Sequence, residues 1–70
     1  MPLAGQRGAE LTSREWEVLE LLSDGESTSA MAERLHVSPV TVRRHVSAIL
    51  RKLEVSDRDA AVKLLQAAEL

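Results

Sequence analysis

The chain has 70 residues, a formal net charge of −2 and no cysteine. This length allows one small domain with a single core, and the lack of cysteine excludes disulfides and thiolate metal sites and favours a cytoplasmic protein. No apolar run approaches the roughly 20 residues that a membrane-spanning helix needs. Trp16 is the only aromatic residue and β-branched residues do not alternate with polar ones, so the composition favours an all-α fold.

The chain opens with a segment that has no helical period. Residues 1–8 (MPLAGQRG) contain glycine and proline, so we expect a disordered tail or a linker remnant before a domain over residues 9–70. Thr12 can then cap a helix over residues 13–23. Glu15, three residues after Thr12, would complete a capping box.

The second predicted helix is short. Gly25 can adopt the left-handed conformation that ends the first helix. Ser27 or Thr28 can then cap a helix over residues 28–35, which a turn of about three residues follows.

The third predicted helix is the longest and covers about residues 39–53. Ser38 is its expected cap, and Pro39 suits the first helical position because no amide hydrogen is needed there. At 100° per residue, one narrow apolar stripe forms, made of Val42, Val46, Ile49, Leu50 and Leu53.

A fourth helix is predicted over residues 57–68, with Ser56 and Asp59 as a weaker capping box. Leu64 and Leu65 on this helix suggest an apolar patch that self-associates. The expected fold is therefore a compact all-α domain of four helices, with a helix-turn-helix in its middle.

Charges are sorted along the chain. Residues 10–33 hold seven acidic residues and one basic residue, whereas residues 34–52 hold five basic residues and no acidic one. From residue 54 onward, four acidic residues accompany two basic ones. Such a run is usually no more than a solvated face. Because this one keeps a single sign and falls mainly on one helix, we favour a functional role.

The third helix would present a cationic face opposite its apolar stripe. Val40, Arg44, Ser47, Ala48 and Arg51 lie on that side, with Arg43 and Lys52 flanking them. A short helix, a tight turn and a longer helix with this face suit a helix-turn-helix that reads the major groove. Arginine pairs with guanine edges, valine meets the thymine methyl group, and small side chains permit close approach. We therefore expect base contacts from Val40, Arg43, Arg44 and Ser47.

Phosphate contacts are expected from other positions on the second and third predicted helices. Arg51 and Lys52 lie further along the third helix, where it would leave the groove. Thr28 and Thr41 stand at helix starts, whose amide groups bind phosphate. His45 lies at the edge of the apolar stripe, and we interpret it as a packing or phosphate-touching residue in preference to a proton-driven switch.

Several short sequence motifs occur together in an order that is typical of one protein family. They are "LTSRE", the Gly25 turn, "MAERLHVS" and "TVRRHVSAILRKL". Over about residues 10–65 the chain resembles the LuxR-type helix-turn-helix domain, the DNA-binding effector of NarL/FixJ response regulators and quorum-sensing regulators. The resemblance implies base reading by Arg43, Arg44 and Ser47, and backbone contacts by Thr41 and Lys52. It also implies a dimer surface on the fourth helix, at Ala60, Lys63 and Leu64.

These observations predict sequence-specific binding of double-stranded DNA that regulates transcription. The chain would be either the effector domain of a bacterial two-component response regulator or a small stand-alone regulator. It would form a homodimer through its C-terminal helix, weakly in isolation, with RNA polymerase as a further candidate partner. No spacing suggests a catalytic triad or a metal site, so we expect no enzyme activity, no metal and no cofactor.

Two alternatives remain open at this point. One is a helical protein-interaction module that docks an acidic or helical partner without binding DNA. The other is promoter recognition of the sigma-factor kind, which shares the helix-turn-helix but needs contacts with core polymerase.

Overall fold

The computed structural model describes residues 11–68, and this part of the chain contains four α-helices and no strand. They are α1 (Ser13–Ser23), α2 (Thr28–Leu35), α3 (Pro39–Leu53) and α4 (Arg58–Ala68). The all-α prediction is therefore confirmed, and α4 begins one residue later than predicted. The tail expected over residues 1–8 lies outside the described residues. None of the helices over residues 11–68 is long and apolar enough to cross a membrane.

The first three helices begin at hydroxyl caps. The side chains of Thr12, Ser27 and Ser38 each accept a hydrogen bond of 3.1 Å from the backbone N–H three residues later. Ser27, and not Thr28, is thus the cap of α2. Glu15 accepts from the Thr12 backbone N–H at 2.9 Å, which completes the predicted capping box.

The predicted cap of the fourth helix is wrong. Asp57 caps α4, because its Oδ1 accepts a hydrogen bond of 2.9 Å from the backbone N–H of Ala60. Ser56 still lies in a bend of the chain, one residue too early to serve α4. Two cap residues stand side by side here, and the acidic one is used.

A residue in the left-handed conformation stops each of the first three helices, as the C-cap of α2 and α3 and directly after the C-cap of α1. Gly25 has φ 84°, and His36 and Glu54 both have φ 59°. After each of them the next backbone N–H bonds back to a carbonyl of the last helical turn, as in a Schellman motif. These sharp stops keep the segments between α1, α2 and α3 short.

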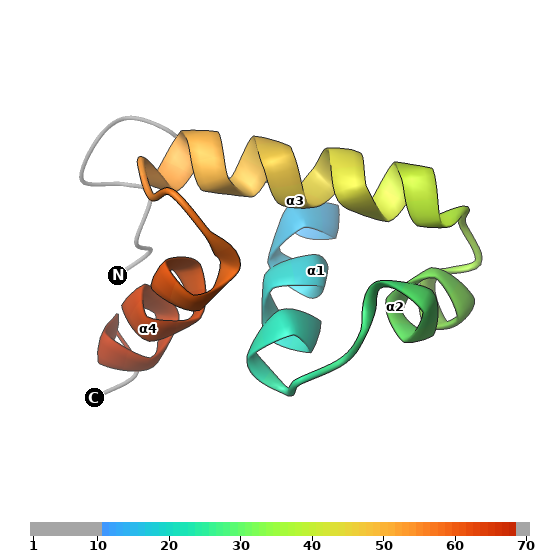
Figure 1. The fold of residues 1–70 in the computed structure, drawn as a ribbon, viewed down its shortest axis with the longest axis horizontal. Helices are drawn as coiled ribbons and strands as arrows, with labels where there is room; N and C mark the ends of the chain where they lie inside the picture. Colours follow the sequence, from blue (N-terminus) through green and yellow to red (C-terminus); the bar gives the residue numbers. More distant parts are fainter. Residues whose placement is uncertain (1–10, 69–70) are drawn as a thin grey trace.

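The helix α3 runs along one edge of the molecule, and Figure 1 shows α1, α2 and α4 on the same side of it. The side chains of α3 that face these helices are buried: Val42, Val46, Ile49 and Leu53. They pack against buried residues of the other helices, which include Leu19, Met31 and Ala61. Leu50, predicted to belong to this stripe, is half-buried at its edge. The opposite face of α3 is left uncovered.

Candidate nucleic-acid interface

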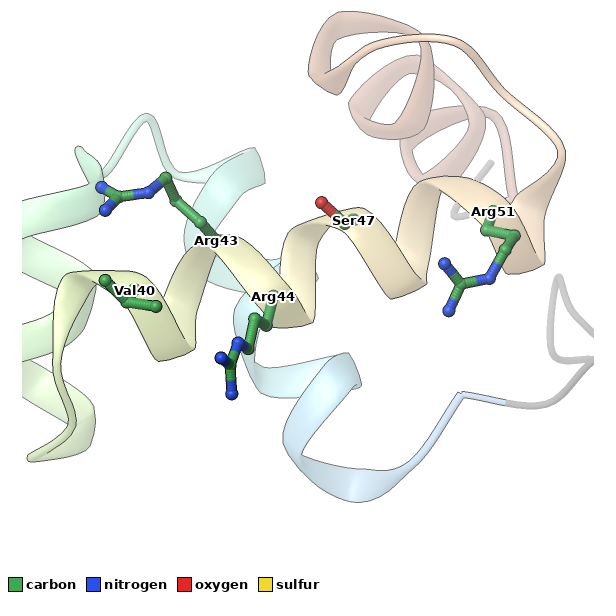
Figure 2. A pocket seen from close by; sticks show the side chains of 5 residues that line it. All are labelled: Val40, Arg43, Arg44, Ser47 and Arg51. Carbon is green, nitrogen blue, oxygen red and sulfur yellow. The ribbon is translucent and has the colours of Figure 1, made fainter.

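The outer face of α3 gathers all four side chains predicted to read bases. Val40, Arg43, Arg44 and Ser47 are exposed, and together with Arg51 they line one shallow, open depression. Val40 is 49% exposed and, with Leu64, is one of two large apolar side chains left exposed among the described residues. Figure 2 shows these five side chains along the axis of α3. The fold does not bury or use any of them.

The three arginines of this face keep their charge available. Within residues 11–68, no ion pair or hydrogen bond engages Arg43, Arg44 or Arg51 through its side chain. In Figure 2 the Arg43 side chain leaves α3 on one side of the helix axis and the Arg44 side chain leaves on the other. The exposed cations therefore cover the width of the face.

Lys52 is placed differently from its neighbour Arg51. Its Nζ donates to Oε1 of Glu15 on α1 at 2.7 Å, and the Glu15 side chain is only 8% exposed. The same carboxylate oxygen accepts from the Thr12 backbone. The first turn of α1 is thus fastened to the last turn of α3. The phosphate contact predicted for Lys52 stays a prediction, since its ammonium group already has a partner within the chain.

The environment of Glu15 alters its acidity. Burial acts to raise the pKa of the Glu15 carboxyl, whereas hydrogen bonds from Lys52 and the Thr12 backbone lower it. Electrostatic interactions with Lys52 and His45 lower it further, and the net pKa lies below the ordinary value of 4.5. The carboxylate therefore stays ionised in the fold near neutral pH. His45 is half-buried on the side of α3 that faces this group.

The two threonines predicted to contact phosphate stand at the first turns of α2 and α3. The Thr41 hydroxyl lies 3.1 Å from the Ser38 hydroxyl. The Thr28 hydroxyl accepts a hydrogen bond of 3.1 Å from Nη2 of Arg58, at the start of α4. Both threonines are half-buried and still reach the surface.

The surface of α4 differs from that of α3. Lys63 is exposed, Leu64 is 36% exposed, and Ala60 is half-buried. The predicted patch around Leu64 and Leu65 is smaller than expected, because Leu65 is only 6% exposed and belongs to the core. Leu64 alone is the large apolar side chain that α4 offers to a partner.

Two contacts in this region were not foreseen from the sequence. Glu15 was interpreted only as a helix cap, and Arg58 only as a charge and as part of the family resemblance. The pairs Glu15–Lys52 and Thr28–Arg58 are 37 and 30 residues apart in the chain. No local pattern signals such pairs. Over residues 11–68, no three His, Asp or Glu side chains lie close enough together to hold a metal ion.

Comparison with known proteins gives one consistent answer. Residues 9–65 match the model of a family described as bacterial regulatory proteins, luxR family. The chain is similar to the transcriptional regulatory protein DegU of Brevibacillus brevis, with 52% identity over 52 residues, which are 74% of this chain and 22% of DegU. It is 50% identical over 52 residues to the transcriptional regulatory protein DesR of Bacillus subtilis, covering 74% of this chain and 26% of DesR.

A third relative is the response regulator protein VraR of Staphylococcus aureus. It is 50% identical over 52 residues, which are 74% of this chain and 25% of VraR. The chain thus spans about a quarter of the length of these curated relatives.

Proposed function

The chain belongs to the luxR family of bacterial regulatory proteins as a helix-turn-helix DNA-binding domain, and we propose that it binds double-stranded DNA by inserting the outer face of α3 into the major groove. One observation carries this proposal. The outer face holds Arg43, Arg44 and Arg51 without any carboxylate partner among residues 11–68, in a chain whose net charge is negative.

The dimensions and chemistry of this face suit a groove. α3 has 15 residues and is therefore about 22 Å long, enough to lie across several base pairs. Its outer face presents Val40, Arg44 and Ser47, which offer an apolar contact, a bidentate donor and a small polar group to base edges. Arg43 at the flank adds a second arginine for base reading.

The phosphate contacts follow from the ends of the helices. Arg51 lies seven residues beyond Arg44, about 10 Å along the same side of α3, where the helix leaves the groove. Thr28 and Thr41 stand in the first turns of α2 and α3, where backbone amide groups favour anions. Lys52 joins this set if its ammonium group, which donates one hydrogen to Glu15, reaches a phosphate with another.

The assembly and cellular role are also proposed. We infer a homodimer through Ala60, Lys63 and Leu64 of α4, which would place two half-sites about one helical turn, roughly 10 bp, apart. The relatives are named as transcriptional regulatory proteins and as a response regulator. On that basis the chain acts on bacterial double-stranded DNA in the cytoplasm, either as an effector domain of a response regulator or as a small stand-alone regulator. We also propose RNA polymerase as a partner, and co-purification of the polymerase with this chain would test that proposal.

Fluorescence anisotropy tests the DNA interface. The parent chain and Arg43→Ala/Arg44→Ala are titrated with a mixed-sequence duplex at several salt concentrations. The parent should bind more weakly as salt rises, and the double variant should lose about 1–3 kcal/mol for each base contact on a selected site. The matched control is Arg14→Ala/Arg34→Ala, which removes the same charge from arginines already paired with Glu17 and Glu26.

The control should bind almost as well as the parent. Equal affinities of the parent and the Arg43→Ala/Arg44→Ala variant, or no binding by the parent at low salt, would overturn the assignment. A protein partner for the cationic face would then be the better hypothesis.

A further inference from the structure

A guanidinium group from α4 reaches the beginning of the helix-turn-helix. Arg58 is the first residue of α4, and its Nη2 donates to Oγ1 of Thr28, the first residue of α2, at 3.1 Å. Arg58 is half-buried. A positive charge is thereby fixed beside the turn that leads into α2, although it comes from a different helix.

This charge lacks a counter-ion within the described chain. Over residues 11–68 no ion pair includes Arg58, and its one side-chain hydrogen bond goes to a neutral hydroxyl. Asp57, the adjacent acid, instead uses Oδ1 to cap Ala60. Asp59 on the other side is exposed and makes no ion pair with Arg58. Burying part of a cation without an opposite charge is unfavourable, so the position is one that an anion would stabilise.

The surroundings of Arg58 increase this demand for an anion. The guanidinium lies at the N-terminal end of α2, where the helix dipole is also positive. Thr28 Oγ1 accepts from Arg58, which leaves the hydroxyl proton of Thr28 free to donate elsewhere. A charged guanidinium and a neutral hydroxyl, both able to donate, therefore lie within hydrogen-bond distance of each other at the start of α2.

We propose that Arg58 is a further DNA-backbone contact, contributed from α4, that holds a phosphate together with Thr28 at the start of α2. The inference rests on the proposed function, and it adds to α3 a contact from the helix that is expected to dimerise. In a helix-turn-helix the first helix crosses the DNA backbone while the second lies in the groove. Arg58 would position the domain on the duplex and would not distinguish bases.

The salt dependence of DNA binding tests this contact in the 70-residue chain. Each neutralised phosphate contributes about −0.9 to the slope of log Kobs against log salt for duplex DNA. Arg58→Gln should make the slope less steep by about 0.9, with the same change on every duplex sequence. The matched control is Arg14→Gln, which removes the same charge from an arginine paired with Glu17 on the surface of α1 and should leave the slope unchanged.

Conservative variants separate a phosphate contact from a purely structural bond. Arg58→Lys keeps the charge and should retain most of the slope. Thr28→Val removes the hydroxyl and should weaken binding while Arg58 stays charged. The inference would be overturned if Arg58→Gln left the slope unchanged and any loss of affinity were explained by a loss of thermal stability. Arg58 would then be a structural residue.

A measurement on the parent chain covers the case in which Arg58→Gln does not fold. On addition of a duplex, the side-chain Nε–Hε signal of Arg58 in an NMR spectrum should shift along with that of Arg44. If the Arg58 signal stayed in place while the Arg44 signal shifted, the phosphate contact of Arg58 would be contradicted and the proposed function would stand. If the Arg44 signal is stationary as well, the proposed function itself fails, so the two failures can be told apart.

Discussion

The inner face of α3 carries Val46 and Ile49, which are 4% and 0% exposed, whereas the outer face carries Arg44 and Arg51 in open solvent. Packing alone explains the inner face, since these side chains fill the space between α3 and the other helices. Packing does not constrain the residues of the outer face, where any polar side chain would be compatible with the fold. The comparison therefore separates what α3 does for stability from what it offers to a partner.

The largest expected effect is on the inner face. Ile49→Ala should lower the free energy of unfolding by about 2–5 kcal/mol, because it leaves a cavity at a fully buried position. Urea denaturation followed by circular dichroism measures this. Ser47→Ala, two residues away on the exposed face, should stay within about 0.5 kcal/mol of the parent. Similar losses from both variants would mean that the two faces are not distinct.

The pair of neighbours at the end of α3 sharpens the comparison. Arg51 has no ion-pair partner within residues 11–68, whereas Lys52 is bonded to Glu15 at 2.7 Å. Arg51→Ala should weaken DNA binding about tenfold at low salt, as the loss of one charged hydrogen bond would. Lys52→Ala should weaken it less and should lower thermal stability instead. Equal losses of affinity would show that Lys52 exchanges Glu15 for a phosphate when DNA binds.

Glu15 gives a smaller effect that depends on pH. Glu15→Gln keeps an acceptor oxygen but loses the charge, so we expect a stability loss of about 1 kcal/mol at pH 7. The folded-state pKa of Glu15 is lowered, so its stabilisation is complete above the unfolded value near 4.5 and disappears as the pH falls through the folded value. The difference between the parent and Glu15→Gln should therefore shrink below about pH 4.5. A difference that stays constant down to pH 2 would contradict this origin.

The smallest effect concerns the left-handed end of α3. Glu54 has φ 59°, a conformation that costs an L-residue about 1 kcal/mol relative to glycine. Glu54→Gly should raise the free energy of unfolding by about 0.5–1 kcal/mol, less any contribution from the Glu54 side chain, while DNA affinity stays unchanged. The matched change at Asp24, which has φ −80° and ends α1 in the right-handed region, should not stabilise the chain.

The parts of this structure that the sequence predicted are those governed by local rules. The caps at Thr12 and Ser38 act within three residues, and the apolar stripe of α3 has the period of a helix. The grouping of Val40, Arg44 and Arg51 follows from the same period. These features need no knowledge of tertiary structure.

The parts that were missed depend on how the helices meet. Lys52 was assigned to phosphate because its charge suits DNA, yet the packing of α1 against α3 brings Glu15 to it. Arg58 reaches Thr28 only because the fold places the first residue of α4 beside the first residue of α2. Leu65 was expected on the surface, and the direction in which α4 packs turns it inward. A charge or an apolar residue counts for function only once its place in the fold is known.

The most direct measurement is an NMR titration of the ¹⁵N-labelled chain with a duplex selected from a random library. The largest shifts of backbone amide signals should fall on α3 at Val40, Arg44 and Ser47, with weaker shifts at Thr28. Signals from Glu20 and Asp24, on the exposed side of α1, should hardly move. Shifts concentrated on α1 or α4, with α3 unchanged, would contradict the assignment of the outer face of α3 as the DNA-binding surface.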